Sequence, residues 1–207
     1  MPRSSTDLLV LHGVRVLGGP PARDVARLFG LDPAEVRELL LDAEASGWVR
    51  QHEWFGSRSW SVTERGKVEN ERQLAAELDA AGVREQVVAV HRAFLPLNRR
   101  HGSACTRWQL NEHIDERVDA AVLRDLRGIA RQLDTVCGDL TAALDRFGVH
   151  APRYRTALDH LLAGDHGWLD APDRPSCHLV WISLHEDLLA SLGIERGTDD
   201  PVEAGSL

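Results

Sequence analysis

The sequence is poor in the residues that mark secreted and membrane proteins. It has three cysteines, at positions 105, 137 and 177, and their wide spacing does not predict a disulfide framework. No run of about 18 apolar residues is present, which excludes a conventional transmembrane helix. The N-terminal stretch has apolar residues at helical spacing but no small-residue cleavage site, so we interpret it as a first helix and not as a signal peptide. We therefore expect a cytoplasmic protein without a membrane partner.

Lysine is also nearly absent, since Lys67 is the one lysine among 24 basic residues. Together with the many alanines and leucines, this indicates a high-GC coding bias of the actinobacterial kind. The formal net charge of −8 argues against a wholly electrostatic nucleic-acid binder. Residues 1–72 hold ten basic and eleven acidic residues, whereas residues 73–207 hold fourteen and twenty-one. Any DNA contact is therefore expected in the first third of the chain.

Catalytic and metal-binding signatures are missing as well. The chain has no G-x-S-x-G, no glycine-rich phosphate loop and no G-x-G-x-x-G after a strand. Ten histidines are present, but none stands in a C-x-x-C or H-E-x-x-H pattern, and adjacent residues such as Cys177 and His178 rarely bind the same ion. Cys105 lies near His101 and His113, as chance alone would produce in this composition. We predict no catalytic residue, no metal and no cofactor.

The first third of the chain predicts three helices, a β-hairpin and a fourth helix. Apolar spacing predicts helices over residues 7–17, 22–30 and 33–46, with Asp32 as the N-cap of the third and Gly47 as its end. Residues 48–54 and 59–63 alternate with period two around a Gly-Ser tip, which is typical of a hairpin. Thr63 is then placed to cap a helix over 64–80. This order of elements is typical of a winged helix, a helix-turn-helix with a β-wing.

Three sequence runs resemble the winged-helix domain of MarR-like bacterial transcriptional regulators. They are V-A-R-L-F-G-L-D-P-A-E-V over 25–36, L-x-x-A-x-x-x-G-W-V over 40–49, and S-V-T-E-R-G over 61–66. The resemblance covers about a third of the chain. It implies a dimeric DNA-binding protein, although winged helices also serve as protein-interaction modules.

The resemblance directs attention to basic residues around the predicted third helix and the wing. Within that helix only Arg37 suits DNA reading, because Glu35 and Glu38 would repel phosphates; this departs from DNA-reading winged helices. Arg58 at the wing tip is the best candidate for insertion into the minor groove. The full set of predicted DNA-binding residues is Arg23, Arg27, Arg37, Arg50, Arg58, Arg65 and Lys67.

The remainder of the chain predicts helices alone. Helical periodicity covers residues 83–100, 115–148, 153–164 and 178–193, and the second of these is long enough to serve as a bundle spine or a dimerisation helix. We expect a mainly α fold with a winged-helix domain over 5–80, a helical domain over 83–195 and a disordered tail over 197–207.

The stretch over 99–115 looks like a polar linker, too polar for a core helix. It mixes aromatic and polar groups of the kind that orient a small molecule. An equally good interpretation is that the tryptophans only fill the core. The predicted ligand-binding residues are Arg107, Trp108, Gln109, His113, Trp181 and His185.

These observations predict a transcriptional regulator that binds double-stranded DNA, forms a homodimer and senses a small-molecule effector. The alternative is a winged-helix interaction module of a non-DNA-binding protein associated with a biosynthetic or metabolic enzyme. An enzyme that uses the polar 99–115 segment is a third interpretation.

Overall fold

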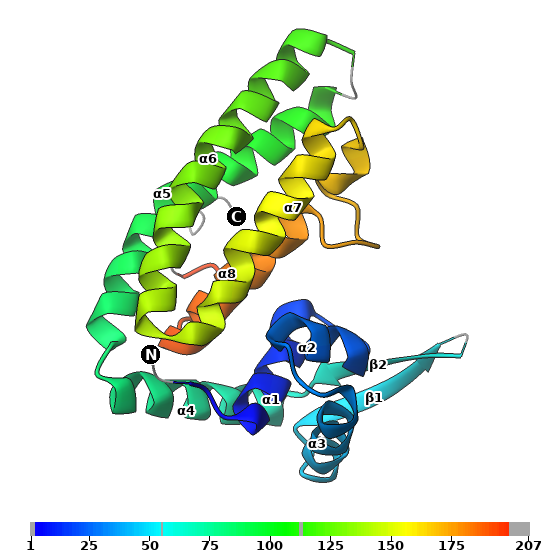
Figure 1. Ribbon diagram of the computed structural model, residues 1–207, viewed down its shortest axis with the longest axis vertical. Helices are drawn as coiled ribbons and strands as arrows, with labels where there is room; N and C mark the ends of the chain where they lie inside the picture. The colour runs from blue at the N-terminus through cyan, green and yellow to red at the C-terminus, as the bar shows by residue number, and fades with distance from the viewer. Residues whose placement is uncertain (1–2, 55, 112–113, 199–207) are drawn as a thin grey trace. The chain divides into compact units, whose positions relative to one another are not determined.

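The computed structural model describes residues 3–54, 56–111 and 114–198. This part of the chain is mainly helical, with one two-stranded sheet after three N-terminal helices, and that level of the predicted fold is confirmed (Figure 1). None of the helices in the described ranges is both long and apolar enough to cross a membrane. The predicted disordered tail lies almost wholly outside the described residues.

The chain divides into two compact units that are not contiguous in sequence. Unit 1 comprises residues 1–85, 144–146 and 185–207, and unit 2 comprises residues 86–143 and 147–184. Helix α8 (Cys177–Leu192) therefore contributes its first half to unit 2 and its second half to unit 1.

Unit 1 begins with three capped helices, α1 (Thr6–Leu17), α2 (Ala22–Phe29) and α3 (Pro33–Ala45). The predicted cap of α3 is confirmed, because the Asp32 carboxylate accepts hydrogen bonds from the backbone amides of Ala34 and Glu35 at 2.9 and 3.0 Å. Gly47 has φ of 74°, a conformation that glycine adopts without strain, and it lets the chain leave α3 for the sheet.

The hairpin pairs β1 (Val49–Trp54) with β2 (Ser57–Val62) in antiparallel register. Trp60 is 2% exposed and joins Val25, Leu40 and Val49 in one apolar core. Its backbone amide donates to the carbonyl of Pro20 at 2.9 Å, which ties the hairpin to the turn before α2. The side chain of Trp54, at the tip, lies outside the described part of the structure.

Helix α4 (Glu64–Ala81) starts against the backbone of the α3–β1 turn. Thr63 caps it as predicted, accepting from the amide of Gly66 at 3.0 Å, while its own hydroxyl donates to the carbonyl of Gly47 at 2.7 Å. Gly66 is buried, and a Cβ at this position would lie 1.9 Å from the carbonyl oxygen of Trp48. The glycine three residues after Thr63 is therefore required for a steric reason, since only a residue without a side chain lets the start of α4 lie this close to the Trp48 carbonyl.

A network of polar side chains is buried in unit 1. Arg146 is 4% exposed and binds the carboxylates of Asp187 and Glu77 and the hydroxyl of Ser191. His12, fully buried in α1, places Nε2 3.0 Å from Asp187 and Nδ1 3.1 Å from the amide oxygen of Asn70. This network joins α1, α4 and the second half of α8.

Unit 2 is built from α5 (Arg84–Asn111, from its third residue), α6 (Glu116–Ala143), α7 (His150–Leu162) and the first half of α8. It also holds a short 3₁₀ turn at His166–Trp168, and a second 3₁₀ turn at Asp145–Val149 is shared with unit 1. Figure 1 shows α5 and α6 running side by side as long antiparallel helices.

The predicted linker over 99–115 is wrong for most of its length, because α5 continues through Pro96 to Asn111. This stretch is helical because its small and aromatic residues are spaced so that they fall on one face of a helix. His101, Ala104, Cys105 and Trp108 recur at helical intervals and are all buried, whereas the polar residues between them fall on the exposed face. The stretch is polar on average, but it forms an amphipathic helix with one buried face.

Candidate nucleic-acid interface and ligand site

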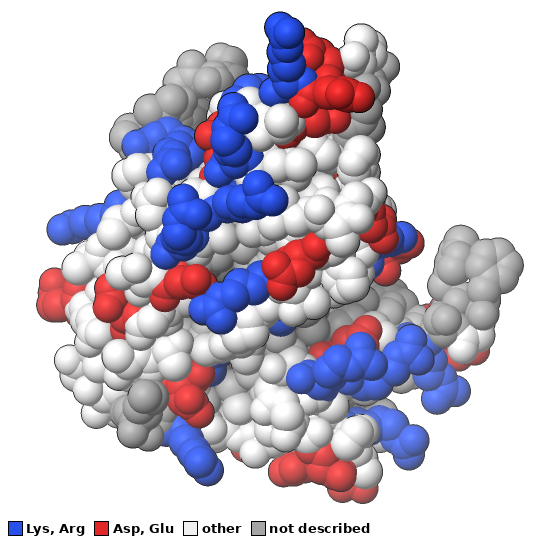
Figure 2. Space-filling view, turned by 45° about the horizontal axis from the view of Figure 1, so that its top comes forward, with Lys and Arg blue, Asp and Glu red and all other residues white. Residues whose placement is uncertain are grey.

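The seven basic residues predicted to bind DNA all belong to unit 1, and none is buried. They come from α2 (Arg23 and Arg27), from α3 (Arg37), from the hairpin (Arg50 and Arg58) and from the start of α4 (Arg65 and Lys67). Figure 2 shows Lys and Arg side chains on one face of the molecule, with Asp and Glu side chains among them.

Four of the seven have an acidic neighbour. Arg23 and Arg27 lie 3.9 and 3.1 Å from Asp24, and the remaining pairs are Arg58 with Glu53 at 3.5 Å and Lys67 with Glu64 at 2.8 Å. Ion pairs of this exposure contribute at most about 1 kcal/mol each to stability. A phosphate group can therefore replace the carboxylate at little cost.

Arg37, Arg50 and Arg65 are exposed and form no ion pair with the residues that the structure describes. The Arg65 side chain lies 4.0 Å from the position of a Cβ on Gly47, next to the turn that connects α3 to the sheet. These three guanidinium groups are the ones most readily available to an anionic partner.

Acidic residues share the surface of α3. Glu35, Glu38 and Asp42 are exposed, and Leu41 beside them is 48% exposed. Counted over the whole sequence, unit 1 holds 13 basic and 21 acidic residues, whereas unit 2 holds eleven of each. The negative charge of the chain therefore belongs to the unit that carries the predicted DNA-binding residues.

The predicted ligand-binding residues do not converge on one cavity. Arg107 is exposed and paired with Asp125, and Gln109 donates to Asp170 at 2.8 Å. Trp108 is buried and packs edge-on against His166.

Of the other three predicted residues, the two that the structure describes are also apart. Trp181 is buried in unit 2 and donates from Nε1 to Asn98 at 2.8 Å, whereas His185 is buried in unit 1. His113 lies outside the described residues.

A cavity of about 480 Å³ lies between α5 and α6 in unit 2. It is an open groove, because most of its lining residues are exposed, and its volume lies within the range of small-molecule sites. Arg100 spans it by donating to Gln132 at 3.2 Å. None of the five predicted residues that the structure describes lines it. The lining residues are Ala89, Val90, Ala93, Pro96, Leu97, Arg100, Gln132, Thr135, Val136 and Asp139.

The sequence interpretation set aside the proximity of Cys105 and His101 as chance, and it did not group these two side chains with His178. The available signal was H-x-x-x-C, whose i,i+4 spacing puts both side chains on one helix face in the same way as H-E-x-x-H. His178 is distant in sequence, and no pattern connects it to the other two.

The ionisation of His101 and Cys105 limits their chemistry. Burial, with a smaller contribution from His178, lowers the pKa of His101 to about 3. Burial also raises the pKa of Cys105 to about 12, and the Asp170 carboxylate adds to the rise. At neutral pH both side chains are uncharged, so they do not form the thiolate–imidazolium pair that a cysteine nucleophile requires.

Comparison with known proteins adds no assignment. No family model, no curated protein and no solved structure matches this chain.

Proposed function

We propose that the chain is a DNA-binding transcriptional regulator in which unit 1 is a winged helix. The observation that carries the proposal is the succession of α2, a tight turn, α3 and a β-hairpin around one apolar core, with Arg37, Arg50 and Arg65 exposed and without ion-pair partners among the described residues. The resemblance of residues 25–66 to MarR-like regulators supports the same interpretation.

In this proposal α3 enters the major groove and the hairpin contacts the adjacent backbone or minor groove. Arg37 is the side chain that reaches base edges, and Arg58 near the hairpin tip contacts the minor groove. Arg50, Arg65 and Lys67 neutralise phosphates. The acidic side chains of α3 then act against non-specific binding, because they repel phosphates wherever the geometry is not matched.

Unit 2 serves as the sensing part in this proposal. The open groove of about 480 Å³ between α5 and α6 combines apolar residues with the Arg100–Gln132 pair and offers a place for a small organic effector. An effector regulates DNA binding only if its affinity differs between the DNA-competent and incompetent states.

We further propose that the protein acts as a homodimer. A two-fold axis places two copies of α3 in successive major grooves about 34 Å apart. Leu110, in the last turn of α5, and Ile114, just after it, are 78% and 84% exposed and offer apolar area for association. Sedimentation should therefore give twice the mass of the chain.

The test is fluorescence anisotropy with duplex DNA from upstream of the chain's own coding sequence, at two salt concentrations. If about four of the seven basic residues neutralise phosphates, the affinity should fall about a hundredfold when salt rises about fourfold. Arg37→Ala and Arg58→Ala should each weaken specific binding by about tenfold.

The matched control is Arg124→Ala, which removes the same charge from an exposed position on α6 in unit 2. Its affinity should equal that of the wild type. Unchanged affinity of both the Arg37 and Arg58 variants, or an equal loss in the Arg124 variant, would rule out the proposed interface.

A protein-interaction module is the second candidate, favoured by the surface of α3. Leu41 is about half exposed between acidic residues, an arrangement suited to a protein partner with a basic rim. The same experiment separates the two candidates, since an interaction module shows no salt-dependent binding to its upstream DNA.

A further inference from the structure

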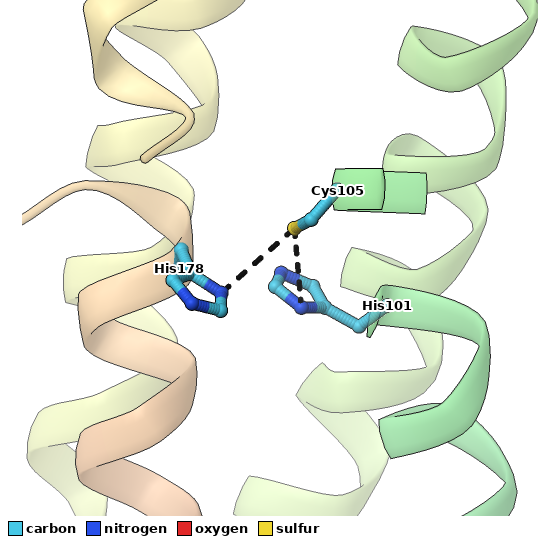
Figure 3. Close-up of side chains that lie close together, drawn as sticks. All are labelled: His101, Cys105 and His178. Carbon is cyan, nitrogen blue, oxygen red and sulfur yellow. Dashed lines mark hydrogen bonds between the residues drawn. The ribbon is translucent and has the colours of Figure 1, made fainter. Parts of the chain in front are cut away.

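Three side chains in unit 2 bring metal-ligating atoms together. His101 and Cys105 lie one turn apart on α5, and His178 lies at the start of α8 (Figure 3). The Sγ atom of Cys105 is 3.7 Å from Nδ1 of His101 and 3.9 Å from Nδ1 of His178. One donor atom from each residue lies within 4.8 Å of the others.

We propose that His101, Cys105 and His178 bind one transition-metal ion of the zinc class. Around tetrahedral zinc, with Zn–S of about 2.3 Å and Zn–N of about 2.0 Å, neighbouring ligand atoms are about 3.4–3.6 Å apart. The two sulfur–nitrogen distances observed here exceed that separation by only a few tenths of an ångström. The two imidazole nitrogens lie within 4.8 Å of each other, so side-chain rotations that bring them closer would close the set on an ion.

Packing holds the ligands in place. The ring of His101 is stacked on Trp181, with centroids 4.2 Å apart and planes within 4°. Trp181 is fixed in turn by its hydrogen bond to Asn98 at 2.8 Å. The rings of His101 and His178 are parallel within 2°, with centroids 6.1 Å apart. Such preorganisation lowers the cost of assembling a site.

Packing alone does not account for the polar atoms of this cluster. Sγ of Cys105 lies within hydrogen-bonding distance of both His101 and His178. A thiol has one proton, so Cys105 donates to only one of its two imidazole neighbours. Metal coordination uses the sulfur and both imidazoles at once.

The donor set decides the class of ion. Two imidazoles and one thiolate favour zinc, cobalt or copper over magnesium and calcium, which take oxygen ligands. His178 is partly exposed, which gives an ion a route to the site. When the ion binds, the Cys105 thiol releases its proton to solvent and its sulfur takes one coordination position. Three protein ligands leave a fourth position for water or a small ligand.

Titration of the metal-free full-length chain with Co²⁺ tests the proposal, because Co²⁺ substitutes for zinc and reports its ligands by absorption. The wild type should bind one equivalent and show tetrahedral bands with sulfur-to-cobalt charge transfer. Cys105→Ser should abolish the charge transfer and weaken binding by at least about tenfold. Cys137→Ser is the matched control, since it changes another buried cysteine and should leave both properties intact.

His178→Gln provides a second variant at a partly exposed position, which keeps the test decisive if Cys105→Ser does not fold. It too should bind at least about tenfold more weakly. Wild-type binding below one equivalent, charge transfer retained in Cys105→Ser, or wild-type affinity in His178→Gln would each overturn the proposal. The readouts use the chain alone, so failure of DNA binding would leave this result unaffected.

Discussion

The side chains of unit 1 include a charged pair that is shielded from water, Arg146 and Asp187. Both are less than 5% exposed, and His12, Glu77 and Ser191 are among their partners. Taking charges out of water costs several kcal/mol per ion, so each member depends on its partners.

Asp187→Ala should lower the free energy of unfolding by about 3–5 kcal/mol, because it leaves the Arg146 guanidinium buried without that carboxylate. Urea denaturation measures the change. The matched control is Asp134→Ala, which breaks an exposed pair with Arg155 and should cost less than about 1 kcal/mol. Equal losses in the two variants would contradict this account of the network.

The carboxyl of Glu186 makes the free energy of unfolding depend on pH in the acidic range. Burial alone would raise its pKa, but hydrogen bonds from Arg196 and Arg15 outweigh that effect and lower the pKa below its ordinary value of 4.5. The unfolded chain therefore binds the proton more tightly. The ion pairs stabilise the folded state fully above pH 4.5, and this contribution is lost as the pH falls further.

Glu186→Gln should accordingly be less stable than the wild type at about pH 7, and the difference should shrink by about pH 3. Urea denaturation at both pH values measures it. Glu116→Gln, at an exposed position on α6, should match the wild type at both. A stability difference between the wild type and Glu186→Gln that stays constant across this range would contradict the assigned pKa direction.

At the scale of single residues, the sequence predicted local interactions and missed distant ones. The caps at Asp32 and Thr63 were predictable, because a cap depends on residues two or three positions away. The partners Arg146 and Asp187 are 41 residues apart, and His101 and His178 are 77 apart. Nothing local in the sequence encodes such pairs, since the packing of whole helices brings them together.

Helix α4 shows how one residue positions an element. Gly66 lets its first turn lie against the Trp48 backbone, and Thr63 bonds to the same turn. Gly66→Ala should destabilise the protein by about 3 kcal/mol, because the added Cβ overlaps the Trp48 carbonyl oxygen and the backbone must move.

Gly138→Ala is the matched variant, at an exposed position on α6 with nothing within 4 Å of the added Cβ. It should stabilise the helix by about 0.5–1 kcal/mol through reduced chain entropy. Thermal denaturation of both variants checks the pair. Shifts of the same sign would contradict the steric role of Gly66.

Element prediction succeeded where apolar spacing was unambiguous and failed where polar residues diluted it. The first three helices and the hairpin agree with the sequence to within a few residues. The predicted helix over 83–100 included Pro96 but ended too early, because the polar average of 99–115 masked the buried row of His101, Ala104, Cys105 and Trp108. A helix tolerates an internal proline when tertiary packing compensates for the lost hydrogen bond.

At the scale of the whole molecule, the sequence analysis placed the excess negative charge in the wrong unit, because it divided the chain at one position whereas the units are not contiguous in sequence. The C-terminal two thirds looked acidic, yet the second half of α8 and the residues after it belong to unit 1, which leaves unit 2 neutral. The proposed DNA contact therefore depends on local arrangement and not on the charge of the unit. The protein should bind its own site with high specificity and unrelated DNA only weakly, because an acidic unit gains little from non-specific electrostatic attraction to phosphates.

Hydrogen exchange of the full-length chain with and without its upstream duplex tests the proposed regulator most directly. The account predicts that DNA protects backbone amides in α3 and in the β1–β2 hairpin, while amides of α6 in unit 2 exchange unchanged. Protection absent from both α3 and the hairpin at saturating DNA would contradict it.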